Sequence, residues 1–492
     1  MRLADIGTLL GLPPVSSDRA SLAVAGLSAD SRAIKPGWLF AALPGTQVDG
    51  RAFVPQALAA GAIAVLAPPG TDLPPGADAW LFAHPEPRRA LARLAGAFFA
   101  PQPAPVVAVT GTNGKTSTVT FAAALWRALG RPGATSVGTL GVHGAGLDRP
   151  GRLTTPDPVA LHAALADIAR AGGGPVALEA SSHGLEQDRL AGLVVQAAAL
   201  TNITRDHLDH HGSMEAYRAA KTRLFSDVLV AGGTAVLNAD IPETSAIEAV
   251  CRDRSLRVFR YGENGAEIRL RTRTPTAHGQ VLALEVLGHD ATVTLPLAGA
   301  FQAMNALAAL GLVLGCEDRP EDMVVRAVNA LETLSGVPGR LENVARRANG
   351  AAVYVDYAHT PDALETVLRA LRPHATGRLV CVFGCGGDRD TGKRPLMGRL
   401  AATLADRVIV TDDNPRSEDP AAIRAQILAA CPGATEIGDR AQAIRVAVAD
   451  LAAGDLLVIA GKGHETGQTV AGVTHPFCDR THAQDAVAEA DT

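Results

Sequence analysis

The residues with the clearest chemical potential follow a short apolar segment that ends at Thr110. Residues 106–110 form a continuous apolar run, typical of a buried parallel strand, and a helix is predicted over residues 116–129. Between them lies a glycine-rich turn. Backbone N–H groups at such a turn bind phosphate, a lysine there reaches the β- and γ-phosphates, and a following hydroxyl holds Mg²⁺. The predicted ATP-binding residues of this loop are Gly111, Thr112, Asn113, Gly114, Lys115, Thr116 and Ser117.

The spacing of this loop is shorter than the common phosphate-loop pattern. That pattern is G-x4-G-K-[ST], whereas two residues separate Gly111 from Gly114 here. The order of strand, loop and helix supplies the context that the motif requires. The alternative is a tight turn between strand and helix that carries an incidental lysine.

Lysine is rare in this chain, because five of the 45 basic residues are lysines and the others are arginines. The sequence therefore uses arginine wherever a generic positive charge suffices. A lysine that persists is expected where a compact ammonium or a deprotonatable amine is needed, although chance explains any single one. The five are Lys35, Lys115, Lys221, Lys393 and Lys462, of which the second, fourth and fifth lie in glycine-flanked segments.

The elements that position these residues indicate three α/β domains, over residues 1–104, 105–337 and 338–492. Proline-rich residues 101–105 and glycine-containing residues 336–340 are predicted linkers between them. In the middle domain, strands over 106–110, 176–179, 197–201 and 234–238 predict a mostly parallel sheet. Residues 257–296 are strand-rich and are expected to form a small antiparallel flap or an edge extension. In the last domain, strands over 351–356, 378–383, 407–411 and 455–460 alternate with helices.

Composition excludes several classes of protein. A net charge of −5 gives no support to a nucleic-acid or anionic-membrane partner. No apolar run reaches the roughly 18–20 residues that a membrane-spanning helix needs, and the opening segment lacks the pattern of a signal peptide. Six scattered cysteines are expected to be reduced thiols. We therefore expect a cytoplasmic protein. Its partners are expected to be small molecules, and the chain is expected to act as a monomer.

Seven segments, in order along the whole chain, resemble the Mur ligase family. They are T-G-T-N-G-K-T-S at 110–117, E-A-S-S-H-G-L at 179–185, T-R-D-H-L-D at 204–209, D-Y-A-H-T-P-D-A at 356–363, G-D-R-D-x-G-K-R-P at 387–395, D-N-P-R at 413–416 and G-K-G-H-E at 461–465. The resemblance implies a central phosphate-loop ATPase domain, an N-terminal UDP-binding domain and a C-terminal Rossmann-like domain that binds an amino acid.

The resemblance also implies an amide-forming reaction of peptidoglycan precursor synthesis. A substrate carboxylate attacks the γ-phosphate of ATP to give an acyl phosphate, and an amine then displaces phosphate. The protein's tasks in such a reaction are positioning and charge neutralisation.

Five residues carry the implied catalytic and metal-binding roles, with Mg²⁺ as the cofactor. Lys115 contacts phosphate, while Glu179 and His207 match the family's magnesium ligands, as does Thr116. Lys221 matches a lysine carbamylated by CO₂, a change open to a neutral amine and closed to arginine. The alternatives are a structural carboxylate for Glu179, a turn or capping residue for His207 and a helix-surface lysine for Lys221. His210 and His211 are interpreted as polar loop residues.

The other implied contacts fall into three groups. Further ATP-binding positions are Asn305, Arg340, Asp356 and His359, and Asp356 is alternatively a hinge or capping residue. UDP-muramoyl-dipeptide positions are Ser31, Thr46, Gln47, Val48, Thr154, Thr155, Ser181, Gln187 and Arg189. Diaminopimelate positions are Arg389, Asp413, Asn414, Pro415, Arg416, Gly461 and Glu465.

The D-N-P-R segment selects among members of the family. It resembles the signature of members that add meso-diaminopimelate, whose second carboxylate fits the guanidinium fork of Arg416. A lysine-adding member or a folylpolyglutamate synthetase is the nearest alternative. From another class, a phosphate-loop switch or motor protein is the alternative; it would release phosphate from ATP alone.

Overall fold

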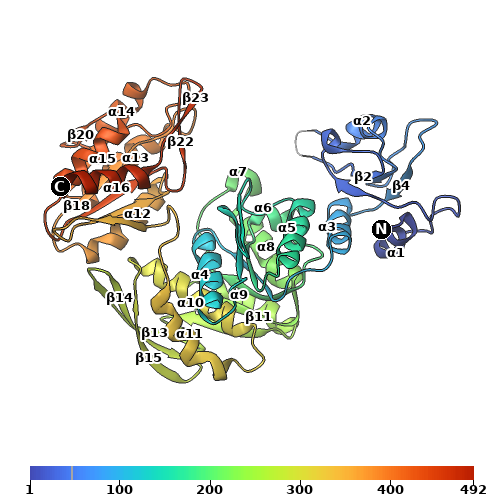
Figure 1. Ribbon diagram of the computed structural model, residues 1–492, viewed down its shortest axis with the longest axis horizontal. Coiled ribbons are helices and arrows are strands. Elements are labelled where there is room, and N and C mark those ends of the chain that lie inside the picture. The colour runs from blue at the N-terminus through green and yellow to red at the C-terminus, as the bar shows by residue number, and fades with distance from the viewer. Residues whose placement is uncertain (46–47) are drawn as a thin grey trace. The chain divides into compact units, whose positions relative to one another are not determined.

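A computed structural model of the protein describes residues 1–45 and 48–492 (Figure 1). It contains two units, which we describe separately. The first consists of Met1–Arg269 and Leu307–Ala327, and the second of Leu270–Ala306 and Val328–Thr492. The predicted positions Thr46 and Gln47 lie outside the described residues.

A four-stranded parallel sheet occupies the N-terminal part of the first unit. Consecutive residues of its strands enter different apolar clusters, since Leu39 packs on one face and Phe40 on the other. Both faces are therefore covered, as parallel sheets require. The strands, in order, are β1 (Gly26–Ser28), β2 (Trp38–Ala41), β3 (Ala64–Ala67) and β4 (Trp80–Ala83), with helices α1 (Leu3–Leu10), α2 (Val54–Ala59) and α3 (Pro87–Phe98).

The larger sheet of the first unit has β5 (Val106–Thr110) at its centre. Its parallel neighbours are β9 (Val176–Glu179) and β10 (Val195–Leu200). Beyond β10 come β11 (Leu229–Asn238) and β12 (Arg257–Gly262), and beyond β9 comes β6 (Thr135–Gly138), all parallel. An antiparallel hairpin of β7 (Gly141–Gly144) and β8 (Leu147–Pro150) completes that edge. The helices are α4 (Lys115–Ala128), α5 (Pro158–Arg170), α6 (Ser182–Glu186), α7 (Leu208–His211), α8 (Met214–Arg223) and α9 (Thr244–Asp253).

The strand-rich residues 257–296 form the predicted antiparallel structure and also extend the sheet. The strand β13 (Ile268–Thr276) starts beside β12, where Ile268 pairs with Tyr261 in parallel. Next come β14 (Gly279–Val286) and β15 (His289–Leu295), which pair antiparallel along their whole length. They are followed by α10 (Ala300–Gly315) and α11 (Val324–Ala330).

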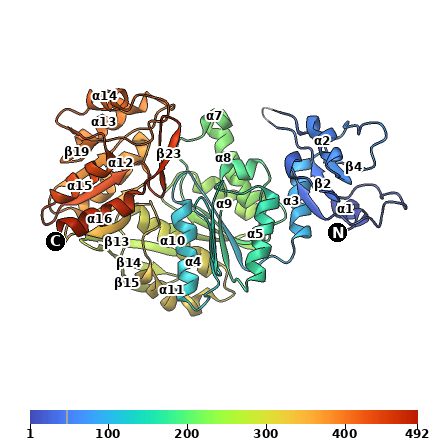
Figure 2. The same ribbon diagram turned by 45° about the horizontal axis from the view of Figure 1, so that its top comes forward.

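The second unit contains a six-stranded sheet with helices around it (Figure 2). All pairs are parallel except the first, and alternate residues of β18, Val380 and Cys381, enter the cores on opposite faces. The strand order is β16 (Glu342–Arg346), β17 (Ala352–Asp356), β21 (Leu456–Ala460), β18 (Leu379–Phe383), β19 (Arg407–Val410) and β20 (Thr435–Glu436). The helices are α12 (Pro361–Leu371), α13 (Lys393–Leu404), α14 (Pro420–Leu428), α15 (Arg440–Ala449) and α16 (Asp479–Ala490), and β22 (Gly467–Val470) pairs with β23 (Val473–Pro476).

The predicted linker over residues 336–340 is a tightly packed turn. Val337 and Gly339 are buried, and Gly339 has φ of 66°. The N–H of Gly339 donates to the Glu342 carboxylate, and its carbonyl accepts from the N–H of Tyr357. A Cβ at Gly339 would lie 2.2 Å from the backbone nitrogen of His464, so this position requires glycine.

A fully buried ion pair anchors the strand end that precedes Gly461. Arg440 donates to both carboxylate oxygens of Asp479 at 2.7 Å and to the carbonyl of Ala460, the last residue of β21. Removing one partner leaves an uncompensated buried charge, so Asp479→Ala is expected to lower the free energy of unfolding by about 3–5 kcal/mol. Thermal denaturation measures this loss. The matched control is Glu365→Ala, which removes an exposed ion pair with Arg369 and should change little; equal melting temperatures for the two variants would contradict the assignment.

The cysteines are free thiols, as the sequence predicts. All six cysteines are free, and Cys251, Cys381, Cys385 and Cys431 are buried. Within residues 1–45 and 48–492, no helix has the length and apolar character needed to cross a membrane.

Candidate active site

The phosphate loop begins where β5 ends, at the centre of its sheet. Gly111 has φ of 151°, and a Cβ there would lie 1.9 Å from the Thr201 hydroxyl, so the turn has no room for a side chain. Gly114 has φ of 88° and starts α4. The Lys115 ammonium donates to the carbonyls of Gly111 and Thr112 at 2.8 Å each. The lysine therefore lies over the loop, as a phosphate-binding residue must.

Glu179 lies at the end of β9, beside β5, where Val109 pairs with it. Its buried carboxylate accepts from the Thr116 hydroxyl at 3.1 Å and from the Thr139 N–H at 2.7 Å. A Cβ at Gly138 would lie 2.1 Å from this carboxylate, so the glycine makes space for it. Hydroxyl and carboxylate oxygens are ligands that Mg²⁺ accepts, and the predicted pair Thr116 and Glu179 is thus in direct contact.

Lys221 is buried in the first unit rather than on a helix surface. It lies in α8, its side chain is 1% exposed, and its ammonium donates to the carbonyl of Gly111 at 2.8 Å. The ammonium also lies 4.3 Å from the centre of the Tyr217 ring. Burial, followed by the nearby charge of Lys115, holds the pKa of Lys221 well below its usual value. The side chain consequently favours the neutral amine.

His207 immediately precedes α7 in the left-handed backbone conformation, with φ of 52°. Its ring makes no capping hydrogen bond, so the capping alternative does not describe its side chain. The ring meets that of His183 edge to face, with centroids 4.9 Å apart. Its Nε2 lies 3.6 Å from the Asp206 carboxylate.

One cavity of about 240 Å³ brings together predicted residues from distant parts of the sequence. The predicted site residues that line the cavity are Lys115, Thr154, Thr155, Ser181, Arg189, His207 and Lys221. Its lining also includes Leu153, Ser182, His183 and Tyr217, to which the sequence analysis gave no role. Two cationic side chains, Lys115 and Arg189, in one concave site favour an anionic ligand.

Arg189 is held in place by its neighbours. Its guanidinium donates to the carbonyl of Thr155 at 2.6 Å and through two nitrogens to the Gln187 side-chain oxygen. Burial lowers the pKa of Arg189, yet the group stays charged. The Thr155 hydroxyl donates to the carbonyl of Glu179, and accepts from the N–H of Ser181. The dipeptide positions therefore form one network at the end of β9.

The N-terminal positions are not part of this cavity. The Ser31 hydroxyl donates to the Gln56 side chain at 2.9 Å, and Val48 is exposed. Neither residue lines the cavity that contains Lys115.

The remaining predicted ATP positions lie in the second unit. Asn305 donates to Gln302, which in turn donates to the carbonyl of Arg340. The Arg340 guanidinium lies 5.0 Å from the centre of the Tyr357 ring. Nδ1 of His359 donates to the carbonyl of Tyr357 at 2.8 Å, and the carbonyl of His359 accepts from Lys393.

Asp356 shows the structural role that the sequence left open as an alternative. Its two carboxylate oxygens accept from the N–H groups of Leu341 and Ala358, at 2.6 and 2.7 Å. These bonds connect the turn at 337–341 to the end of β17. Burial raises the pKa of Asp356 to about 6, against the opposing charge of Arg340.

The predicted amino-acid positions gather beside the ends of β19 and β21. Asn414 donates to the Glu465 carboxylate at 3.0 Å, and a Cβ at Gly461 would lie 2.7 Å from the Asp413 carboxylate. Burial raises the pKa of Asp413. Arg416, with φ of 53°, donates to the carbonyl of Gly387 at 2.8 Å. Arg389 is exposed and Pro415 is buried.

Lys462 is the central residue of this group and was missing from the predicted site. It is fully buried, and its ammonium donates to the side-chain oxygens of Asn414 and Glu465 at 3.0 and 3.1 Å. Two features of the sequence could have identified Lys462: lysine is rare in this chain, and this lysine lies between two glycines. Tyr217 gave a weaker signal, an aromatic residue one helical turn before Lys221.

His210 and His211 are not the loop residues that the sequence suggested. They form the last turn of α7, and the His211 side chain is 1% exposed. Burial lowers the pKa of His211, and it lowers that of the neighbouring His183 to about 4, so both rings are neutral near pH 7. Four histidine rings thus lie together beside the cavity, those of His183, His207, His210 and His211.

Three family models match the chain in order. They describe the Mur ligase family catalytic domain (residues 23–99), the Mur ligase middle domain (109–313) and the Mur ligase glutamate ligase domain (339–463). A protein of Caulobacter vibrioides named UDP-N-acetylmuramoyl-L-alanyl-D-glutamate--2,6-diaminopimelate ligase is 53% identical over 95% of this chain and 96% of its own. A protein of the same name from Rhizobium meliloti is 49% identical over 96% of each.

A solved structure titled with the same ligase name has the same fold. It is 34% identical, covers 99% of both chains and superposes with a TM-score of 0.76. The expected three-domain α/β architecture with mostly parallel sheets is confirmed by this likeness. Sequence, fold and the loop at the end of β5 agree, and the chain belongs to the Mur ligase family.

Proposed function

We propose that the chain is an ATP-dependent ligase that joins meso-diaminopimelate to UDP-N-acetylmuramoyl-L-alanyl-D-glutamate through an amide bond. The observation that carries the proposal is the cavity lined by Lys115, Arg189, His207 and Lys221. It gathers a phosphate-loop lysine and a carboxylate-binding arginine within one site. The relatives of 53% and 49% identity carry the name of this activity.

The reaction proceeds in two steps. An oxygen of the substrate's glutamyl carboxylate attacks the γ-phosphorus of ATP, the bond to the β-phosphate oxygen breaks, and ADP leaves. The neutral amine of diaminopimelate then attacks the acyl carbon, inorganic phosphate leaves, and the nitrogen loses a proton. The amide is formed at the cost of one ATP, and no oxidant or reductant is needed.

The chain's own groups position these reactants. Lys115 neutralises the charge that develops on the transferred phosphoryl group, an effect worth several kcal/mol in a pre-organised site. Arg189, fixed by Gln187 and Thr155, binds a carboxylate of the dipeptide. Thr116, Glu179, His207 and Lys221 are the residues proposed to hold Mg²⁺. Bound there, Mg²⁺ neutralises phosphate charge and orients the phosphoryl group.

Lys221 is proposed to act as a carbamate. Its neutral amine attacks CO₂, forms a carbon–nitrogen bond and loses one proton, which leaves an anionic carboxylate-like group suited to Mg²⁺. Burial and the depressed pKa of Lys221 support this step, because both favour the amine that reacts. Arginine cannot form this product.

Lys221→Ala is expected to lower the ligation rate by about 10²–10³-fold, as loss of one pre-organised electrostatic group does. Added acetate or formate should restore part of the rate by replacing the missing carboxylate. Lys221→Arg is the matched control, because it fills the space, cannot form a carbamate and should not be rescued. A ¹³C carbamate resonance in wild-type protein under ¹³CO₂ gives an independent readout. Full activity of Lys221→Ala without added acid would contradict the role.

The other proposed contacts complete the assignment. Residues 1–104, with Ser31, Thr46, Gln47 and Val48, are proposed to bind the UDP end, residues 105–337 ATP, and residues 338–492 the amino acid. Asn305, Arg340, Asp356 and His359 are proposed to contact the nucleotide. Because the reaction consumes ATP, the proposal also assigns the enzyme to the cytoplasm.

The product identifies the activity. Protein incubated with ATP, Mg²⁺, the UDP-linked dipeptide and meso-diaminopimelate should yield a species heavier than the dipeptide by diaminopimelate less one water, as measured by mass spectrometry. Absence of this species, with folded protein and all substrates present, would refute the proposed function.

A further inference from the structure

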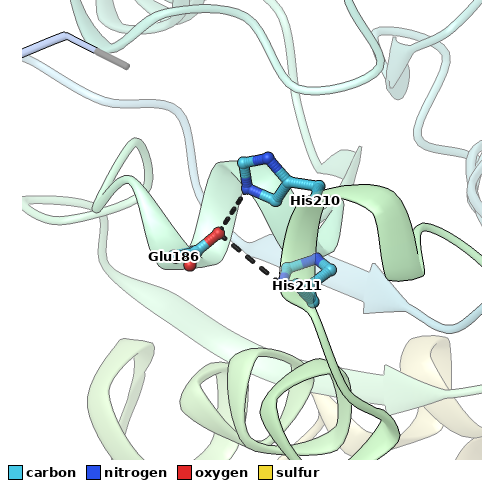
Figure 3. Close-up of side chains that lie close together, drawn as sticks. All are labelled: Glu186, His210 and His211. Atoms are coloured by element: carbon cyan, nitrogen blue, oxygen red, sulfur yellow. Dashed lines mark hydrogen bonds and ion pairs between the residues drawn. The ribbon is translucent and has the colours of Figure 1, made fainter.

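A carboxylate and two imidazoles converge outside the proposed magnesium site. Glu186 is the last residue of α6, and His210 and His211 end α7 (Figure 3). The Glu186 carboxylate lies 2.6 Å from Nε2 of His210 and 3.6 Å from Nδ1 of His211. One donor atom from each residue lies within 4.8 Å of the others, and among the residues that the structure describes no other group of three such side chains meets this criterion.

The contacts of His211 orient its ring between Ser182 and Glu186. Nε2 lies 3.0 Å from the Ser182 hydroxyl, which is hydrogen-bond distance. Nδ1 lies 3.6 Å from the Glu186 oxygen, beyond hydrogen-bond distance. In the tautomer that donates from Nε2 to the hydroxyl, the lone pair of Nδ1 faces the carboxylate.

In that tautomer two electron-rich atoms, Nδ1 of His211 and the Glu186 oxygen, face each other without a hydrogen between them. This arrangement repels unless a cation lies between the atoms. A hydrogen bond from the second ring nitrogen to a neighbouring oxygen is also the usual way in which a metal-binding histidine is oriented. Ser182 provides that oxygen for His211.

We propose that Glu186, His210 and His211 bind one divalent transition-metal ion of the Zn²⁺ class. Two imidazole nitrogens and one carboxylate are a ligand set that Zn²⁺ accepts, with a fourth position for water. Mg²⁺ prefers oxygen ligands in an octahedral shell, so the set discriminates against the ion proposed for the phosphate loop. The site is independent of the proposed ligase activity.

Binding at this site would connect two segments of the candidate active site. Ser181 directly precedes α6 and His207 directly precedes α7, and both line the cavity. An ion held by the ends of both helices would cross-link them. Because the ion binds the folded state, it should also raise the melting temperature, by an amount that grows with the logarithm of its concentration over its dissociation constant.

The test uses full-length protein treated with a chelator and then titrated with Zn²⁺ in excess Mg²⁺, by calorimetry. Co²⁺ replaces Zn²⁺ in a parallel titration, because its visible absorption reports nitrogen and oxygen coordination. The variants are Glu186→Gln and His210→Ala, both at exposed positions. His143→Ala is the matched control, since Nδ1 of His143 pairs with the Asp148 carboxylate at 2.7 Å without a second imidazole in that pair. His207→Ala reports on the proposed magnesium site.

We expect one Zn²⁺ per chain that excess Mg²⁺ does not displace. Glu186→Gln and His210→Ala should each weaken binding by at least about tenfold, since even supporting residues of metal sites contribute that much. His143→Ala and His207→Ala should bind as the wild type does. Equal affinity in all variants, loss of Zn²⁺ in excess Mg²⁺ or weakening only by His207→Ala would each overturn the proposal. Circular dichroism of each variant establishes that the fold is retained.

Discussion

Lys115→Ala is expected to reduce the rate of amide formation by at least about 10²–10³-fold while the fold persists. The ammonium lies over the carbonyls of Gly111 and Thr112, at the point where a strand end and a helix start meet. Loss of the ammonium removes stabilisation of the charge that develops during phosphoryl transfer.

Initial rates of ADP and phosphate release measure the effect, with circular dichroism as the test of folding. Lys35→Ala is the matched control: Lys35 is an exposed lysine 5.8 Å from the Trp38 ring, outside the cavity, and its variant should retain wild-type rates. Wild-type turnover by Lys115→Ala would remove the phosphate-loop assignment.

Arg416→Ala is expected to lower kcat/KM for meso-diaminopimelate by about 10²-fold, because a hydrogen bond between charged groups contributes about 1.5–3 kcal/mol. One guanidinium nitrogen of Arg416 donates to the Gly387 carbonyl, which orients the group. The remaining donors suit the second carboxylate of diaminopimelate, a group that lysine lacks. The selectivity between the two amino acids should therefore fall together with the rate.

Arg416→Lys separates charge from geometry. It retains a positive charge but lacks the planar fork, so it should lie between the wild type and Arg416→Ala. The measurement is kcat/KM for diaminopimelate and for lysine in each variant. An Arg416→Ala enzyme that still prefers diaminopimelate by the wild-type ratio would show that another residue selects the substrate.

The buried parallel strands could be predicted from sequence because their apolar runs are continuous. Residues 106–110 and 176–179 are strands with the bounds that the sequence indicated. The hairpin of β7 and β8 was missed, because glycines and charged residues dominate residues 141–150 and edge strands need few buried side chains.

The site was predictable where a local motif positions the residue, as in the phosphate loop. It was not predictable where folding sets the environment. Lys221 lies between Arg218 and Arg223 on a polar helix, and its burial depends on the nearby Tyr217 and on Gly111, which lies 110 residues earlier in the sequence. The same holds for Lys462 and for the grouping of Glu186 with His210 and His211.

The central claim is that ATP cleavage is coupled to joining an activated acyl donor, the UDP-linked dipeptide, to a diamino diacid. Phosphate release should be measured with ATP and Mg²⁺ alone, with either the UDP-linked dipeptide or meso-diaminopimelate added, and with both. We predict rapid release only when both are present, with one phosphate per amide formed. Equal release from ATP alone would instead identify a phosphate-loop NTPase, and release with lysine in place of diaminopimelate at the same rate would identify a different ligase.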